Sequence, residues 1–120
     1  MKFDNMINEL FVRFPMLRNE YESEGDYIKD LQHPCYAIVF VPFIRKVVFA
    51  NDEDMIQSIC NFMECMANSD DEDELVSELL AVSVLESILS EREIISSLKP
   101  YFGAKTLKIL STMEKEYGWS

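Results

Sequence analysis

The chain is poor in the residues from which turns, metal sites and catalytic sites are usually built. Its 120 residues include three glycines, four prolines, three cysteines and one histidine. So few turn-forming residues disfavour an all-β domain, which needs a turn after each short strand. The three cysteines are an odd number and lack metal-ligand spacing, so we expect reduced, mostly buried thiols.

The chain also lacks a long apolar run. The longest run, residues 36–44, is too short to cross a bilayer and contains Pro42. The first ten residues, MKFDNMINEL, mix acids and amides with apolar residues, unlike a signal peptide. An apolar content of 48% is nevertheless typical of a folded chain. We therefore expect a single domain over residues 1–120, located in the cytoplasm and without a membrane partner.

Basic residues are almost absent from the middle third. Between residues 50 and 93, thirteen acids accompany a single base, Arg92, whereas the whole chain has 22 acids and 11 Lys plus Arg. The remaining residues therefore hold nine acids and ten bases, so the net charge of -11 resides in the middle third. Such asymmetry bears on partners more than on fold. It predicts a basic partner and disfavours binding to DNA or RNA, which requires a basic patch.

The spacing of apolar residues at three- and four-residue steps predicts helices through most of the chain. The stretch 36–50 is ambiguous, because its β-branched and aromatic residues would also suit a buried strand. No second strand is available to pair with it, so we expect a buried helix that is kinked at Pro42 or begins near it. The predicted elements are a helix from Phe3 to Phe14 ended by Pro15, a polar loop over 19–34 with at most one helical turn, and helices over 36–50, 51–68, 71–89, 91–98 and 104–116.

The predicted breaks between helices lie about eighteen to twenty-one residues apart, so a pair of helices repeats at about forty residues. This period is close to that of HEAT repeats, although any antiparallel bundle with short loops would give a similar spacing. The expected fold class is therefore all-α, a single domain of about five to seven antiparallel helices in a HEAT-like or irregular array.

Acids cluster where three of these helices begin, in the sequences ANDED at 50–54, NSDDED at 68–73 and LSERE at 89–93. We expect Asn or Ser to cap each helix, with acids in the first turn favoured by the helix dipole. Five consecutive acids at 70–74 exceed that use, because neighbouring like charges repel. The predicted partner-binding residues are Asp52, Glu53, Asp54, Glu64, Asp70, Asp71, Glu72, Asp73 and Glu74.

Two further surface features can be read from the sequence. A polar stripe from Asp54 through Glu64 to Asn68 would join the acidic groups as a ridge about 20 Å long. Residues 19–30 alternate acids with Tyr21 and Tyr27, a composition found at interfaces. A loop whose tyrosines pack on the core is an equally good interpretation.

No constellation of residues predicts an enzyme. His33 is the only histidine, lies in the predicted loop and has no second ligand at metal-binding spacing. Neither a Gly-rich phosphate loop nor the ligand alternation of an EF-hand is present. We therefore predict no catalytic residue, no metal site and no cofactor.

Several segments resemble an uncharacterised family of small bacterial all-α proteins, whose members occur among the immunity proteins of polymorphic toxin systems. The matching segments are NELFVRFPMLRNEYESEGDY, FVPFIRKVV, SDDEDELVSELLAVSVLESIL and LKPYFGAKTLKIL. The resemblance implies an all-α domain and a cytosolic protein that neutralises a cognate toxin. It supplies no residue-level binding site.

The leading hypothesis is a non-catalytic acidic binding protein, an immunity protein that covers the basic surface of a cognate toxin such as a nuclease. The alternative is a nucleic-acid mimic or acidic adaptor that binds a DNA- or RNA-binding protein of the same cell. A small enzyme with paired carboxylates is a third class, which no sequence feature favours.

Overall fold

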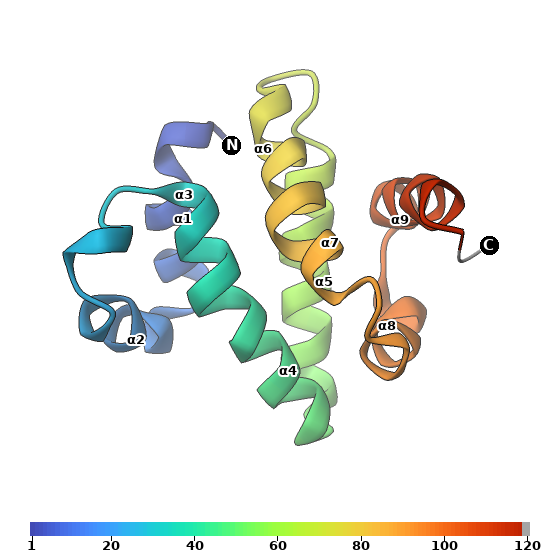
Figure 1. Ribbon diagram of the computed structural model, residues 1–120, viewed down its shortest axis with the longest axis horizontal. Helices are drawn as coiled ribbons and strands as arrows, with labels where there is room; N and C mark the ends of the chain where they lie inside the picture. Colours follow the sequence, from blue (N-terminus) through green and yellow to red (C-terminus); the bar gives the residue numbers. More distant parts are fainter. Residues whose placement is uncertain (119–120) are drawn as a thin grey trace.

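The N-terminal part of the chain forms a layer of short helices on one side of the molecule (Figure 1). The computed structural model describes residues 1–118. The first predicted helix is confirmed, and it ends at Arg13, two residues before Pro15, whose missing N–H cannot continue the helix. The elements of this layer are η1 (Phe3–Asn5), α1 (Met6–Arg13), η2 (Pro15–Leu17), α2 (Arg18–Ser23), η3 (Asp26–Ile28) and α3 (Gln32–Cys35).

The predicted loop over 19–34 is wrong, because α2, η3 and α3 occupy most of it. Ile28 of η3 is fully buried, and Tyr21 provides a second anchor for this segment. Its ring packs on Phe11 with 5.2 Å between centroids, and its hydroxyl accepts a hydrogen bond of 2.9 Å from the N–H of Asp30. One buried isoleucine and one half-buried tyrosine thus fix a segment whose other residues are mostly polar.

The ambiguous stretch is helical and belongs to a continuous helix from Gln32 to Phe49, made of α3, η4 (Tyr36–Phe40) and α4 (Val41–Phe49). The segment η4 is a π-helical turn that ends just before Pro42. Because Pro42 has no N–H, it cannot donate the α-helical bond to the carbonyl of Ile38. The prediction of a buried helix disturbed at Pro42 is confirmed, but the helix begins at Gln32.

A second long helix also contains a π-helical segment. It consists of α6 (Glu74–Leu79), η5 (Leu80–Leu85) and α7 (Glu86–Ile88). The two π-helical segments pack against each other. His33 of α3 also contacts the second segment, since its Nδ1 lies 2.6 Å from the hydroxyl oxygen of Ser83 in η5. The histidine therefore lies in a helix and has a defined partner, which corrects its predicted place in a loop.

The helix α5 (Glu53–Ala67) runs through the middle of the molecule, with α1–α3 on one side and α8 (Arg92–Leu98) and α9 (Ala104–Glu116) on the other (Figure 1). The short η6 (Lys99–Tyr101) joins α8 to α9. The chain is 80% helical, and residues 1–118 contain no strand. With each continuous stretch that contains an α-helix counted once, and the isolated 3-10 turn η3 left out, these residues form seven helices, which confirms the predicted all-α class.

One apolar core connects these layers. At its centre the rings of Phe14, Phe40 and Phe62 lie 5.6–5.8 Å apart, and two of the three pairs are edge-on. Two of the three free cysteines, Cys35 and Cys60, are buried, and burial raises the pKa of each thiol to about 12. The third cysteine is exposed.

The expectation that Asn or Ser caps α5, α6 and α8 is wrong, because an acid occupies the N-cap position of each of these three helices. Asp52 accepts from the N–H of Met55 at the start of α5, and Asp73 accepts from the N–H of Leu75 at the start of α6. The residue before α8 is Glu91. Ser69 is not free to cap, since its hydroxyl donates back to the carbonyl of Cys65.

Candidate acidic binding surface

Glu64 departs from the predicted exposed ridge, because its carboxylate is bound to the first turn of α9. It accepts hydrogen bonds from the N–H groups of Lys105 (3.1 Å) and Thr106 (2.9 Å), and from the hydroxyl of Thr106 (2.8 Å). Burial acts to raise the pKa of Glu64, but these bonds and one from the Asn68 amide outweigh it and leave the pKa below its ordinary value. Glu64 is therefore a helix cap supplied from another helix.

Gly103 allows this contact. A Cβ built at this position would lie 2.6 Å from Cγ and from Oε1 of Glu64, closer than real Cβ atoms come. The backbone of Gly103 has φ −76°, which any residue adopts, so close approach alone requires the glycine. The start of α9 thus lies directly on Glu64 and interrupts the polar stripe of α5.

The two acidic groups lie at opposite ends of α5. Asp52 caps that helix. Glu53 and Asp54 are exposed in its first turn, where their negative charges interact favourably with the helix dipole. The 70–74 group follows the other end of the same helix. Because Glu64 is covered by α9, no continuous carboxylate ridge connects the groups.

Within the 70–74 group, Glu72 and Asp73 bind the beginning of the chain. The terminal amino group of Met1 donates to Glu72 at 2.9 Å, and the N–H of Phe3 donates to Asp73 at 2.9 Å. The bond from the terminal amine lowers the pKa of Glu72, and the bond from Phe3 lowers the pKa of Asp73. These two predicted partner-binding carboxylates therefore already have partners within the chain.

The remaining acids of this region gather around an open hollow of about 620 Å³ beside α6. Asp70, Glu74 and Glu78 line it together with Ser77, Ala81 and Ile109. Ser77 donates to the carboxylate of Asp70, whereas the carboxylates of Glu74 and Glu78 make no ion pair with any residue in 1–118. Asp71 is exposed beside the hollow and likewise has no ion-pair partner in this range.

A second cavity of about 350 Å³ continues the hollow toward α9. The two cavities share Asp70, Ala81 and Ile109, and Lys105 and Lys108 line the far part. Together they form one groove, here called the acidic groove, with carboxylates on its α6 side and two lysines on its α9 side.

The acidic groove can bind cationic side chains through its α6 wall. A carboxylate in an open hollow accepts bidentate hydrogen bonds from a guanidinium, and Ala81 and Ile109 offer apolar surface for the side-chain stem. The sequence prediction included Asp70 and Glu74 but missed Glu78. The spacing of Glu74 and Glu78 on one helix face was the available signal.

The other surface considered from the sequence, residues 19–30, has only one exposed tyrosine. Tyr21 packs on the core, while Tyr27 is 62% exposed and its hydroxyl donates to Glu24 at 2.8 Å. Residues 1–118 hold no group of three His, Cys, Asp or Glu arranged to bind a metal ion. In the same range no helix is long and apolar enough to span a bilayer.

Comparison with known proteins gives a family but no activity. No curated protein and no solved structure matches the chain. A family model described as a domain of unknown function, DUF7674, matches residues 7–118, which include α1 to α9 almost completely and the whole acidic groove. The chain therefore belongs to the DUF7674 family.

Proposed function

We propose that this protein is a non-catalytic acidic binding protein, and specifically an immunity protein that neutralises a cognate toxin by covering a basic surface. The observation that carries the proposal is the gathering of Asp70, Glu74 and Glu78 around one open hollow. Glu64, Glu72 and Asp73 are excluded from the proposed contact, since they already bind groups of the same chain. The family's description names no activity, so the immunity role rests on charge and on the sequence resemblance.

The electrostatics of the α6 wall of the groove suit a basic group, whereas Lys105 and Lys108 on the α9 side would repel one. Glu74 and Glu78 are one helical turn apart, and like charges at this spacing destabilise a helix by about 0.2–0.5 kcal/mol. A guanidinium or ammonium group placed between them relieves that repulsion. Binding is therefore favoured both by the new ion pairs and by the relief of the repulsion between Glu74 and Glu78.

A toxin that cleaves nucleic acid needs a basic substrate groove, and an acidic protein that covers this groove prevents access. Complementary charge raises association rates toward about 10⁸–10⁹ M⁻¹s⁻¹ at low salt, which suits rapid neutralisation. A standard interface of about 800 Å² per partner would use roughly an eighth of the 6568 Å² surface of this chain. The groove and its rim can be covered by a contact of that size.

The test compares the wild type with D70N/E74Q/E78Q and with a control that makes the same charge change elsewhere, E22Q/D26N/D30N. Each protein is immobilised, and proteins from the native host lysate are captured at about 50 mM and about 300 mM salt. The captured basic protein is then expressed in a recipient cell with each variant. We expect the wild type and the control to bind it and to restore growth, and the groove variant to fail in both assays.

Two results would contradict the proposal. Equal binding by the groove variant and the wild type would show that the groove is not the contact. Capture of a housekeeping nucleic-acid-binding protein that is not toxic would favour the alternative, an acidic adaptor or nucleic-acid mimic. That alternative uses the same carboxylates but a different target.

A further inference from the structure

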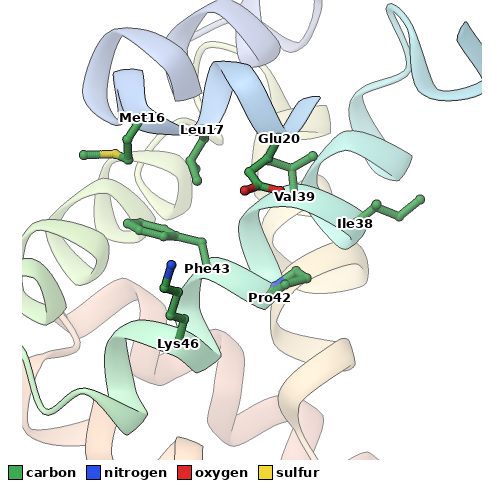
Figure 2. A pocket seen from close by; sticks show the side chains of 8 residues that line it. All are labelled: Met16, Leu17, Glu20, Ile38, Val39, Pro42, Phe43 and Lys46. Atoms are coloured by element: carbon green, nitrogen blue, oxygen red, sulfur yellow. The ribbon is translucent and has the colours of Figure 1, made fainter. Parts of the chain in front are cut away.

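A further cavity, separate from the acidic groove, lies between η2 and α2 on one side and the helix made of η4 and α4 on the other (Figure 2). Its volume is about 300 Å³, and it is open to solvent on one side. Met16, at its edge, is 51% exposed. The apolar lining residues are Met16, Leu17, Ile38, Val39, Pro42 and Phe43.

Two charged residues complete the lining. Glu20 comes from α2 and Lys46 from α4, and neither side chain makes an ion pair with any residue in 1–118. In Figure 2, Glu20 lies toward the Val39 end of the cavity and Lys46 toward the Phe43 end. The cavity thus combines an apolar floor with one unpaired negative and one unpaired positive group.

The spacing of these residues sets the length of a matching ligand. Val39 and Lys46 are seven residues apart on one helix face, which corresponds to about 10 Å along the axis. An extended peptide of about three residues has the same length, at about 3.3 Å per residue. Its free amino end can pair with Glu20 and its carboxylate with Lys46, while apolar side chains cover the floor.

The π-helical turn contributes to the shape of this site. Ile38 and Val39 belong to η4, and Pro42 lies two residues after its end at Phe40. A π-helical turn alters the direction of the side chains that follow it, and such turns are frequent at binding sites. The irregular part of the helix therefore forms one wall of the cavity.

We propose that this cavity binds short apolar peptides with free termini, about three residues long, with the amino end at Glu20 and the carboxyl end at Lys46. This activity is separate from the acidic groove, which lies on the side of α9 (Figure 1). The ligand class is defined by an apolar body and opposite charges at its two ends.

The probe is trileucine with free termini, titrated into the full chain by calorimetry, beside trileucine that is acetylated and amidated. We expect a Kd on the order of a millimolar or tighter for the free peptide, and about three- to tenfold weaker binding after each end is blocked. Leucine alone should bind more weakly than trileucine, because it cannot reach both charged groups. Shifts of NMR signals should concentrate on the residues that line the cavity.

Two variants test whether Glu20 binds the amino end of the peptide and Lys46 its carboxyl end. E20Q and K46M should each weaken the free peptide about three- to tenfold and leave the blocked peptide unchanged. E22Q and K29M, exposed acids and bases of the same region outside the cavity, should bind as the wild type does. The groove variant D70N/E74Q/E78Q should also bind trileucine normally, which keeps this test independent of the proposed toxin contact. Equal affinity for free and blocked trileucine, or no binding of either at several millimolar, would overturn the proposal.

Discussion

Glu64 on α5 and Glu74 on α6 are glutamates of the same acidic third, yet their surroundings differ. Glu64 accepts three hydrogen bonds from Lys105 and Thr106, about forty positions later in the chain. Glu74 lies on the wall of an open hollow and has no ion pair within residues 1–118. The difference teaches that a high density of acids in a sequence mixes carboxylates that stabilise the fold with carboxylates that are available to a partner.

The largest expected effect on folding comes from removing the Glu64 carboxylate. Glu64→Ala leaves the N–H groups of Lys105 and the buried Thr106 without their acceptor. We expect the free energy of unfolding to fall by about 2 kcal/mol, measured by urea denaturation. Glu78→Gln is the matched control on an exposed face, and an equal loss in both variants would contradict the capping role.

Low pH should also weaken the Glu64 cap, because it protonates the carboxylate. The pKa of Glu64 is lower in the folded protein than its ordinary value of 4.5, so unfolding takes up protons at low pH. The contribution of the Glu64 carboxylate to the free energy of unfolding is therefore complete above pH 4.5, and it is lost as the pH falls through the pKa of the folded protein. We expect E64A to lose less stability than the wild type between about pH 7 and about pH 3. Asp73 and Glu114 also have lowered pKa values, but both residues are present in the wild type and in E64A. If the stability of the two proteins falls in parallel with pH, Glu64 does not cap α9.

Gly103 gives a second way to break the Glu64 contact. Gly103→Ala keeps an allowed φ but places Cβ against the Glu64 side chain, and we expect a loss of about 1–2 kcal/mol in urea denaturation. In the E64A background the clash disappears, so the same substitution should cost almost nothing. A double-mutant cycle measures this coupling, and additive losses would show that Gly103 matters for another reason.

A smaller loss is expected inside the 70–74 run. Asp73→Ala removes the cap of α6 and the acceptor for the N–H of Phe3, so the protein should be less stable than the wild type but more stable than E64A. Asp71→Ala removes an exposed carboxylate that makes no ion pair within residues 1–118, and it should leave the midpoint of thermal unfolding unchanged. Identical midpoints for both variants would remove the distinction between these neighbouring acids.

The smallest change in stability, and opposite in sign, is expected from the groove variant D70N/E74Q/E78Q. Relief of the repulsion between Glu74 and Glu78 should raise the free energy of unfolding by about 0.2–0.5 kcal/mol. Circular dichroism should show unchanged helix content. A marked loss of helix would mean that these acids serve the fold, as Glu64 does, and that no carboxylate wall is left for a partner.

Much of the fold could be predicted because apolar periodicity is a local property. The stripe from Ile56 to Ala67 predicted α5, and Pro100 with Gly103 bounded the last helix, Ala104–Glu116, at the residues where it lies. The segment 19–34 was missed because its order depends on the contacts of Tyr21 with Phe11 and with the N–H of Asp30. Packing of the tyrosines on the core was one of the two interpretations of this segment, but its polar composition gave no sign that the packed segment would be helical.

The candidate site was predictable only in part. Acid spacing located Asp70 and Glu74, and the same pattern extended one turn further would have included Glu78. The roles of Glu64, Glu72 and Asp73 depend on N–H or amino groups more than forty positions away, which no local pattern reveals. The cavity beside Pro42 is formed by two helices that pack in three dimensions, so sequence spacing could not indicate it.

The paired π-helical turns make the chain unusually sensitive to a change in length. A π turn holds one residue more than an α-helical turn, so deleting a residue within 36–40 would allow a regular helix. The part after the deletion would then rotate by about 100° relative to the part before it. Ile44 and Val47 would leave the core while exposed neighbours entered it. In this helix a one-residue deletion should therefore be far more damaging than most point substitutions, and a compensating change would be needed in the facing segment, 80–85.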